Sequence, residues 1–213
     1  MDALHLFQMC LNTHYTDVEN DVSFAVRRTE DRLYILFEWS RGSMDWKNNL
    51  DFPVAPYRGM QDLWYCHRGF LRAWKTAEPY VEEILQTLRP EQTTVAGYSH
   101  GGALATLCYE YIWFRHPGLR PHLRGMGFGA PRIVSCPVGC DALAARWANY
   151  TVVRNLDDIV THLPPWFMGF RHGGRLWEIG KQGRYTSFDA HRPENYITSL
   201  TALSPAEAAQ FPV

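Results

Sequence analysis

The amino-acid sequence predicts an α/β fold, with a mostly parallel central sheet, an N-terminal antiparallel hairpin and helices on both faces. Short β-branched and apolar runs alternate with helical segments of ten or more residues, which are long enough for crossover connections between parallel strands. The 213 residues, of which 46% are hydrophobic and 20% charged, can bury one sizeable core. We therefore expect a single domain over residues 1–213, without internal repeats or linkers.

The N-terminal third predicts a helix, a hairpin and a loop. Helical periodicity in residues 2–11 is followed by two β-rich runs, and the polar turn at Glu30 and Asp31 between them indicates a hairpin. The segment after the hairpin, residues 41–64 (RGSMDWKNNLDFPVAPYRGMQDLW), contains two glycines and two prolines. So many chain-breaking residues disfavour regular structure. Residues 41–64 are therefore predicted to form a mobile loop.

The rest of the chain alternates between predicted helices and strands. Residues 69–88 have apolar side chains at helical spacing and predict a helix that is interrupted or restarted near Pro79. The run TTVAGYS at 93–99 predicts a short buried strand, and a helix over 101–115 follows it. The later elements are expected, in order, as a strand at 124–129, a helix at 138–148, strands at 150–156 and 174–181, and a helix at 193–203.

Charge and apolar patterning narrow the expected partners and compartment. The formal net charge is −1, and the lysines and arginines form no basic stripe, so nucleic acid is not an expected partner. No apolar stretch is long enough for a transmembrane segment. At the N-terminus, where a signal peptide would be continuously apolar, the polar residues Asp2, His5 and Gln8 interrupt the apolar run. An odd number of dispersed cysteines favours reduced thiols over a disulfide framework: Cys10, Cys66, Cys108, Cys136 and Cys140. We expect a cytoplasmic protein, and the sequence leaves a leaderless or trimmed secreted form open.

A serine at a predicted corner between a strand and a helix is the first chemical signal. Gly97, Ser99 and Gly101 form the pattern G-x-S-x-G, which turns the chain sharply and exposes the serine hydroxyl above the sheet. The N–H groups at the start of the following helix would face an oxyanion formed there. Ordinary turn glycines are the alternative interpretation of the bare pattern. The preceding strand and a third glycine, Gly102, favour a nucleophilic Ser99.

A nucleophilic serine needs a histidine as its base. In sheet hydrolases the acid and the histidine follow the serine along the chain, each beyond the carboxyl end of a later strand. Of the nine histidines, three lie in suitable later segments: His162, His172 and His191. His162 lies on the same loop as the candidate acids discussed below and is too close to them to bridge an acid to Ser99. His172 begins the last predicted strand, at the opposite edge of a parallel sheet, so His191 is the preferred base. The alternative is that His191 only caps the helix that begins near Pro193.

The acid must accept the imidazole N–H and stabilise the imidazolium that forms. Asp157 and Asp158 lie just beyond the predicted strand at 150–156, and spacing alone does not choose between them. Either carboxylate could instead be solvated in its loop, as most loop aspartates are. Asp141 and Asp189 are weaker candidates on the same grounds.

Taken in order, these segments resemble the class 3 lipases, the fungal-type triacylglycerol lipase and feruloyl esterase family of α/β-hydrolases. GYSHGGALA is similar to that family's GHSLGGALA, CHRGF to its VHxGF, GFGAPR to its strand ending GxPR, and NLDDIVTHLPP to its NxxDxVPxLPP. The similarity covers most of the chain, from near Phe24 to Tyr196. It implies an α/β-hydrolase fold and a serine hydrolase for carboxylic esters. It also implies that Asp158 is the acid, His191 the catalytic histidine and His172 a structural one.

The resemblance further implies an oxyanion hole and a lid. SRGS is similar to the family's FRG[ST], which assigns the two oxyanion donors to Ser43 and to the backbone N–H of His100. The chain departs from the family at Tyr98 and His100, which stand where the family has His and Leu, and in a shorter lid stretch. Five apolar residues there are candidates for contact with acyl chains or lipid, and core packing is the equal alternative: Met44, Trp46, Phe52, Val54 and Tyr57.

The predicted reaction is hydrolysis of acylglycerols or similar lipid esters through an acyl-enzyme, with transient contact to a lipid surface. A carboxylesterase or feruloyl-type esterase for small soluble esters, and a non-catalytic binding module on a hydrolase fold, remain alternatives. No metal or cofactor is required. The pair in CPVGC, Cys136 and Cys140, has the wrong spacing for a metal site, and no second pair follows it.

Overall fold

The central sheet has the topology that the sequence predicts. The computed structural model describes residues 2–19, 22–39, 53–57, 64–135 and 145–210. Among these residues a seven-stranded sheet has the order β1-β2-β3-β6-β7-β9-β11. The first three strands pair antiparallel, and the strands from β3 to β11 run parallel, so the predicted fold class is confirmed. The strands are β1 (Thr16–Glu19), β2 (Val22–Arg28), β3 (Leu33–Phe37), β6 (Thr93–Tyr98), β7 (Leu123–Phe128), β9 (Tyr150–Asn155) and β11 (Arg175–Ile179).

A second, smaller sheet was not expected from the sequence. In the described part of the chain it has four antiparallel strands in the order β10-β8-β5-β4. The prediction that 41–64 lacks regular structure is wrong where residues 54–57 pair with the next strand. Pro56 is compatible with this pairing because β4 is an edge strand, where a missing N–H donor is tolerated. The strands are β4 (Val54–Tyr57), β5 (Trp64–His67), β8 (Val134–Ser135) and β10 (Phe170–Arg171).

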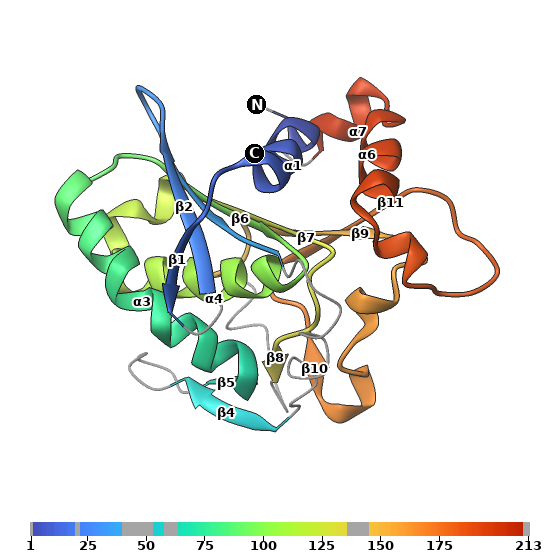
Figure 1. Cartoon of the computed structure of the whole chain (residues 1–213), viewed down its shortest axis with the longest axis horizontal. Coiled ribbons are helices and arrows are strands. Elements are labelled where there is room, and N and C mark those ends of the chain that lie inside the picture. The colour runs from blue at the N-terminus through green and yellow to red at the C-terminus, as the bar shows by residue number, and fades with distance from the viewer. Residues whose placement is uncertain (1, 20–21, 40–52, 58–63, 136–144, 211–213) are drawn as a thin grey trace.

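Helices cover both faces of the central sheet (Figure 1). The helices α1 and α6 pack with one buried cluster on one face, and α3 and α4 pack with a second cluster on the other. No helix of the described residues is both long enough and apolar enough to cross a bilayer. The helices are α1 (Ala3–Asn12), α3 (Arg68–Leu88), α4 (His100–Arg115), α6 (Pro193–Thr201) and α7 (Pro205–Ala209), with short 3₁₀ turns η1 (Pro117–His122), η2 (Ile159–His162), η3 (Trp166–Met168) and η4 (Asp189–His191).

Two predicted helices differ from the structure. The helix α3 continues through Pro79, which is exposed, instead of breaking there. Its buried face, which includes Trp74 and Val81, packs on the core across the proline, so tertiary packing stabilises the helix where the local signal predicts an interruption. For the helix expected at 138–148, residues 138–144 lie outside the described residues and 145–149 form turns.

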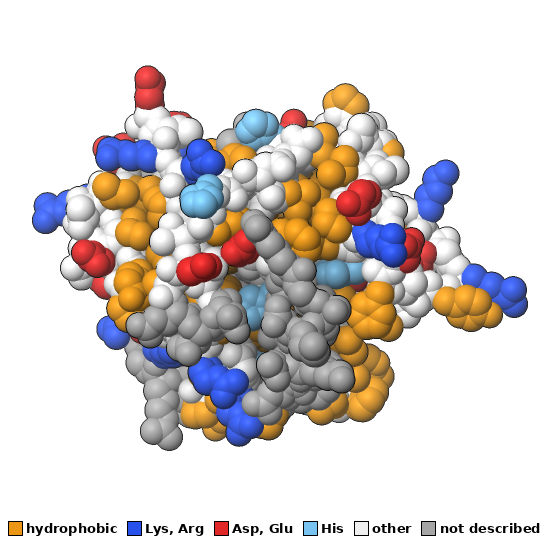
Figure 2. Space-filling model, in the orientation of Figure 1, with side chains coloured by type: hydrophobic (Ala, Val, Ile, Leu, Met, Phe, Trp, Pro, Cys, Tyr) orange, Lys and Arg blue, Asp and Glu red, His pale blue; other side chains and the backbone are white. Residues whose placement is uncertain are grey.

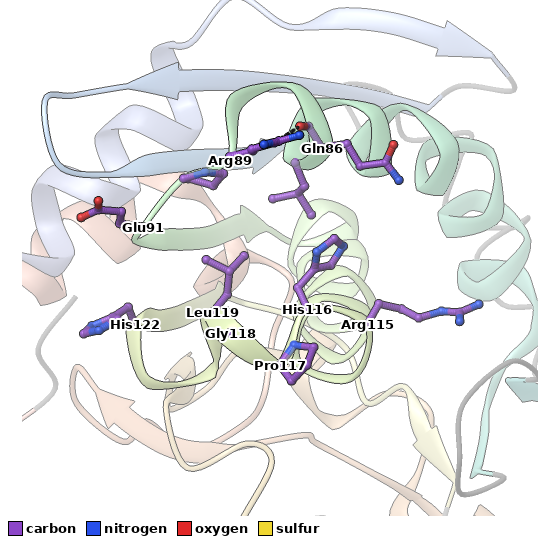
Figure 3. Close-up of a pocket in the computed structure, with 11 residues that line it drawn as sticks. Gln86, Arg89, Glu91, Arg115, His116, Pro117, Gly118, Leu119 and His122 are labelled. Atoms are coloured by element: carbon purple, nitrogen blue, oxygen red, sulfur yellow. Dashed lines mark hydrogen bonds between the residues drawn. The ribbon is translucent and has the colours of Figure 1, made fainter.

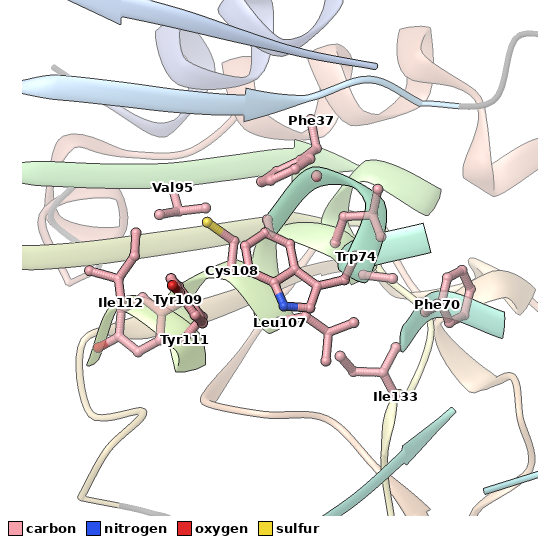
Figure 4. Close-up of a cluster of buried hydrophobic side chains, with 14 of the residues drawn as sticks. Phe37, Phe70, Trp74, Val95, Leu107, Cys108, Tyr109, Tyr111, Ile112 and Ile133 are labelled. Carbon is pink, nitrogen blue, oxygen red and sulfur yellow. The ribbon is translucent and has the colours of Figure 1, made fainter. Parts of the chain in front are cut away.

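The helix α4 is fixed in the core directly after Ser99. Figure 4 shows side chains from α4, α3 and the sheet packed together, among them Cys108, Trp74 and Phe37, all fully buried. The one acidic side chain of α4, Glu110, is also fully buried and pairs with Arg146 at 2.8 Å between Oε1 and Nη1. Pairing is what makes a charge tolerable at this depth. The start of α4 is therefore held firmly against the end of β6.

Candidate active site

Ser99 stands at the corner between β6 and α4 in a strained backbone conformation. Its φ of 56° and ψ of −121° lie outside the regions that serine ordinarily adopts. The Ser99 N–H donates to the carbonyl oxygen of Phe128 at 2.8 Å, which ties the corner to β7. The chain thus turns at the position that the G-x-S-x-G pattern indicates.

The glycines beside Ser99 are small because backbone passes next to them. A Cβ on Gly97 would lie 2.2 Å from the carbonyl oxygen of Gly101, and a Cβ on Gly101 would lie 2.3 Å from the carbonyl oxygen of Phe37. Gly102 similarly faces the Cβ of Ala130, at 2.8 Å from an added Cβ. The close approach of β3, β6 and α4 therefore excludes larger side chains at the corner.

Gly101→Ala is expected to destabilise the fold by about 3 kcal/mol or more, because the opposing carbonyl belongs to a strand and cannot rotate away. The matched control is Gly118→Ala, where an added Cβ meets no atom within 4 Å and the expected change stays within about 0.5 kcal/mol. Urea unfolding of both variants measures the difference. Equal stability of the two variants would contradict the close-packing explanation.

Ser99, His191 and Asp158 are joined by hydrogen bonds. The Nε2 atom of His191 lies 2.9 Å from Ser99 Oγ, and its Nδ1 atom lies 2.7 Å from Asp158 Oδ2. All three side chains are buried, and Asp158 is completely so. A proton on Nδ1 donates to the carboxylate and leaves Nε2 free to accept the serine proton. The structure thus brings together the three residues that the sequence favours as nucleophile, base and acid.

The choice between Asp157 and Asp158, which spacing leaves open, has a geometric answer. The Asp158 carboxylate faces the imidazole, whereas Asp157 Oδ2 accepts a hydrogen bond from the Gly183 N–H at 2.5 Å in a partly exposed loop. Of the weaker candidates, Asp189 is an exposed side chain and Asp141 lies outside the described residues. Only Asp158 among the described acids contacts the base.

One residue that supports the acid, Tyr196, was not found by sequence reasoning. The hydroxyl of Tyr196 donates to Asp158 Oδ2 at 2.6 Å and accepts from the backbone N–H of Asn155 at 3.1 Å. Burial raises the pKa of Tyr196, so its hydroxyl stays protonated as a donor. The available signal in the sequence was the position of Tyr196 on the predicted helix just after His191, from which its hydroxyl can reach back to Asp158.

Tyr98, where this chain departs from the family pattern, contacts the base directly. Its ring stacks on the His191 imidazole, with centroids 5.0 Å apart and planes at 27°. Its hydroxyl donates to the backbone carbonyl oxygen of His191. Burial raises the pKa of Tyr98 and keeps that donor protonated. Tyr98 therefore fixes both the ring and the backbone of residue 191.

Tyr98→Phe is expected to lower kcat about fivefold with little change in KM, because the ring stack remains while a hydrogen bond worth about 1 kcal/mol is lost. Steady-state kinetics on a soluble ester measures this. Tyr80→Phe, at a tyrosine that is 41% exposed on α3, is the control and should match the parent chain. A kcat for Tyr98→Phe equal to that of the control would show that the contact does not position His191.

The two alternative histidines belong to the scaffold. The Nε2 atom of His172 lies 2.9 Å from the carbonyl oxygen of Thr161, and burial lowers the pKa of His172 to about 3. The imidazole is therefore neutral at neutral pH and donates its Nε2–H to Thr161. Burial also lowers the pKa of His162, which lies at the end of η2.

His172 is expected to make the fold less stable in acid. Its pKa falls from an ordinary value of 6.5 to about 3 on folding, so between these values the unfolded chain binds more protons than the folded chain. The free energy of unfolding therefore decreases as the pH falls through this window. His172→Gln, whose amide can still donate to Thr161, should lose less of its free energy of unfolding than the parent chain does as the pH falls. Urea unfolding of both proteins from neutral pH to about pH 4.5 tests this, and a stability difference that is independent of pH would refute it.

The predicted oxyanion and lid residues have different outcomes. The backbone N–H of His100 is in the first turn of α4, directly after Ser99 in the chain. Val54 is 46% exposed on β4. Tyr57 is 1% exposed, and its hydroxyl bonds with Trp74 and Glu78, so a lid role for it is wrong because β4 packs it under α3. The other predicted residues lie outside the described residues: Ser43, Met44, Trp46 and Phe52.

A pocket of about 830 Å³ lies at the end of the central sheet opposite to Ser99 (Figure 3). Its lining includes Arg89 and Glu91, which precede β6, whereas Ser99 follows the last residue of that strand. Six strand residues span about 20 Å, so the pocket is separate from the candidate active site.

No metal site is evident in the described part of the chain, where no three His, Cys, Asp or Glu side chains are grouped to hold an ion. Cys136 and Cys140 lie outside that part. Cys10, Cys66 and Cys108 are free, buried thiols, and burial raises the pKa of Cys66 to about 12. These thiols are therefore protonated core side chains.

A strained serine corner on a parallel sheet, with an aspartate and then a histidine in later loops at the same edge, defines the α/β-hydrolase class. The chain belongs to the class 3 lipase family, because the family model described as Lipase (class 3) matches residues 34–168. The resemblance seen in the sequence motifs is thereby confirmed.

Individual relatives agree with this family. The lipase of Rhizomucor miehei is 32% identical over 156 residues, which are 71% of this chain and 42% of that protein. A solved structure of Rhizomucor miehei triacylglyceride lipase has a TM-score of 0.70 and 24% identity, covering 84% of this chain and 77% of that one. The propeptide complex of Rhizomucor miehei lipase has a TM-score of 0.61 and 28% identity, covering 76% and 53%. The chain spans less than half the length of the curated relatives that it matches.

The expectation of a cytoplasmic protein is contradicted by two relatives. A protein of Fusarium solani, 31% identical over 110 residues (50% of this chain and 32% of that protein), is named a secreted mono- and diacylglycerol lipase. A Malassezia globosa protein that is 30% identical over 115 residues carries the same description. The dispersed thiols did not indicate a compartment, because Cys10, Cys66 and Cys108 are buried and out of reach of a redox partner in any compartment.

Proposed function

We propose that this chain hydrolyses carboxylic esters, acylglycerols or similar acyl esters in particular, through an acyl-enzyme on Ser99. The single observation that carries the proposal is the hydrogen-bonded series from Ser99 Oγ to His191 Nε2 and from His191 Nδ1 to Asp158 Oδ2, starting at a strained corner. The relatives named as triacylglyceride and as mono- and diacylglycerol lipases support the choice of acylglycerols.

In the proposed mechanism, Ser99 Oγ attacks the ester carbonyl carbon while His191 Nε2 takes the hydroxyl proton. Asp158 stabilises the imidazolium that forms. The developing oxyanion accepts a hydrogen bond from the backbone N–H of His100, and we assign the second donor to Ser43. His191 then returns the proton to the leaving alcohol. Water, deprotonated by the same imidazole, releases the acid from the acyl-enzyme and restores the serine.

The imidazolium is the species that the site must stabilise, and the acid is arranged for this. Asp158 is completely buried, yet its Oδ1 accepts the Val160 N–H at 2.8 Å and its Oδ2 accepts from Tyr196 as well as from His191. Fixed donors of this kind stabilise negative charge on a buried carboxylate. The Asp158 carboxylate, in contact with Nδ1, favours the protonated base in the transition state.

The test is hydrolysis of p-nitrophenyl esters from acetate to palmitate, with and without detergent micelles. Activity that is highest on long-chain esters presented in micelles supports a lipase. A maximum on short soluble esters would show instead a carboxylesterase or feruloyl-type esterase. Absence of turnover on every ester would leave only a binding module on a hydrolase fold.

A further inference from the structure

The four most exposed large apolar side chains of the described residues lie in one stretch of the chain, which also contains the exposed Met168. Phe167 and Tyr185 are each 74% exposed. Trp166 is 64% exposed, Phe188 62% and Met168 44%. All of them lie between the acid and the histidine of the candidate site along the chain. Exposed apolar side chains that are grouped together mark a contact site for a partner or a membrane.

The backbone of the turn η3 (Trp166–Met168) has a fixed conformation, and its three apolar side chains are exposed on it. Pro165 precedes the turn, and Gly169 follows it in the left-handed region with a φ of 85°. The Gly169 N–H donates to the carbonyl oxygen of Trp166 at 3.0 Å. The next residue, Phe170, is 1% exposed and anchors the turn in the core. The exposure of η3 is therefore part of the fold.

Positive charge lies at the base of η3. Arg171 Nη1 donates to the carbonyl oxygen of Trp166 at 3.2 Å. Arg132 Nη1 donates to two carbonyl groups of the segment that leads into the turn. Burial, together with the charges of Arg154 and Arg171, lowers the pKa of Arg132. Among the described residues, no carboxylate forms an ion pair with Arg132 or Arg171.

The turn lies at the same end of the sheet as the candidate active site. The segment leaves the carboxyl end of β9 and passes Asp158 before it reaches η3, and β10 after it pairs with β8. Figure 2 shows hydrophobic side chains gathered at the lower right of the molecule, over the coil beside β10 in Figure 1. A surface that docks on this turn would therefore meet the edge of the sheet from which Ser99 emerges.

We propose that η3, with Arg132 and Arg171 at its base, is a docking surface for a negatively charged lipid–water interface. Tryptophan and phenylalanine partition into the boundary between lipid and water, and guanidinium groups behind them attract anionic lipid. The proposal rests on the proposed function for its purpose, since hydrolysis of acyl esters releases carboxylates at such an interface. It places lipid contact outside the stretch predicted as a lid.

The test is binding of the full chain carrying Ser99→Ala to sedimented vesicles, so that no lipid is hydrolysed. Vesicles contain phosphatidylcholine alone or with phosphatidylglycerol. Combining Trp166→Ser with Phe167→Ser is expected to weaken binding to the anionic vesicles about tenfold or more. Arg171→Gln is expected to weaken binding about fivefold, and only on the anionic vesicles. Tyr80→Ser, at an exposed side chain on α3, is the matched control and should bind as the parent does.

Equal binding by the parent and the double variant would overturn the proposal, as would no binding by the parent. So would a dimer in gel filtration that depends on Trp166 and Phe167, because a second copy would then be what covers the turn. Vesicle binding without esterase activity in the unmutated chain would remove the proposed function and keep the docking surface. Esterase activity without vesicle binding would keep the proposed function and remove the docking surface.

Discussion

Ser99→Ala is expected to reduce kcat on any ester substrate by about 10⁴ to 10⁶, with the fold intact. The reason is covalent: the hydroxyl is the only group of the three joined side chains that can form the acyl-enzyme, and alanine leaves His191 with no nucleophile to deprotonate. The remaining donors at the start of α4 would still bind an oxyanion, so a small rate above background is expected. Steady-state kinetics on p-nitrophenyl acetate measures the loss.

Covalent labelling makes the same prediction specific to one atom. An organophosphonate should label the unmutated chain once, on Ser99, and should leave Ser99→Ala unlabelled. Denatured protein is the control, because labelling that survives unfolding would not depend on the geometry at Ser99. Labelling of Ser99→Ala at another residue, or retention of more than about a tenth of the activity, would disprove the nucleophile.

The parts of the fold that local signals specify could be predicted from the sequence. The strand β6, the corner at Ser99 and the small residues at the start of α4 all follow from one local pattern, and packing agrees with it. The strand β4 and the unbroken helix α3 could not be predicted in this way. Both contain a proline, Pro56 or Pro79, and both are stabilised by partners that are distant in the sequence.

The candidate site shows the same division. Chain order and loop position were enough to prefer His191 over His172, because the edge of a parallel sheet on which a loop lies follows from topology. Neighbouring residues such as Asp157 and Asp158 share that edge, so only the direction of each side chain separates them. The supporting contact of Tyr196 likewise depends on where a helix docks.

The lid stretch shows what burial adds. Tyr57 and Val54 lie on the same short strand and have equal status in the sequence, yet one is 1% exposed and the other 46%. Tyr57 bonds with Trp74, a core residue of α3. An apolar residue in a segment rich in glycine and proline is therefore no guide to lipid contact by itself. The exposed turn η3 lies in a segment that the sequence pattern did not single out.

Asp158→Asn is expected to lower kcat by about 10⁴ while the neighbouring Asp157→Asn stays within about twofold of the parent. The backbone fixes how an amide would sit at position 158. The Val160 N–H donates to Oδ1 at 2.8 Å, so the amide oxygen must occupy that place and the amide NH₂ must face His191 Nδ1. An imidazole that accepts at Nδ1 carries its proton on Nε2 and cannot accept one from Ser99.

The comparison with Asp157→Asn separates this effect from a general loss of charge in the loop, since both substitutions remove one carboxylate from adjacent positions. Asp157 bonds to the Gly183 N–H, a contact that an asparagine oxygen can keep. Kinetics on a soluble ester, with circular dichroism to verify folding, distinguishes the two variants. If both lose activity equally, the carboxylates act only through their charge. If Asp157→Asn loses more, the assignment of the acid to Asp158 is wrong and the hydrogen bond to His191 does not carry the reaction.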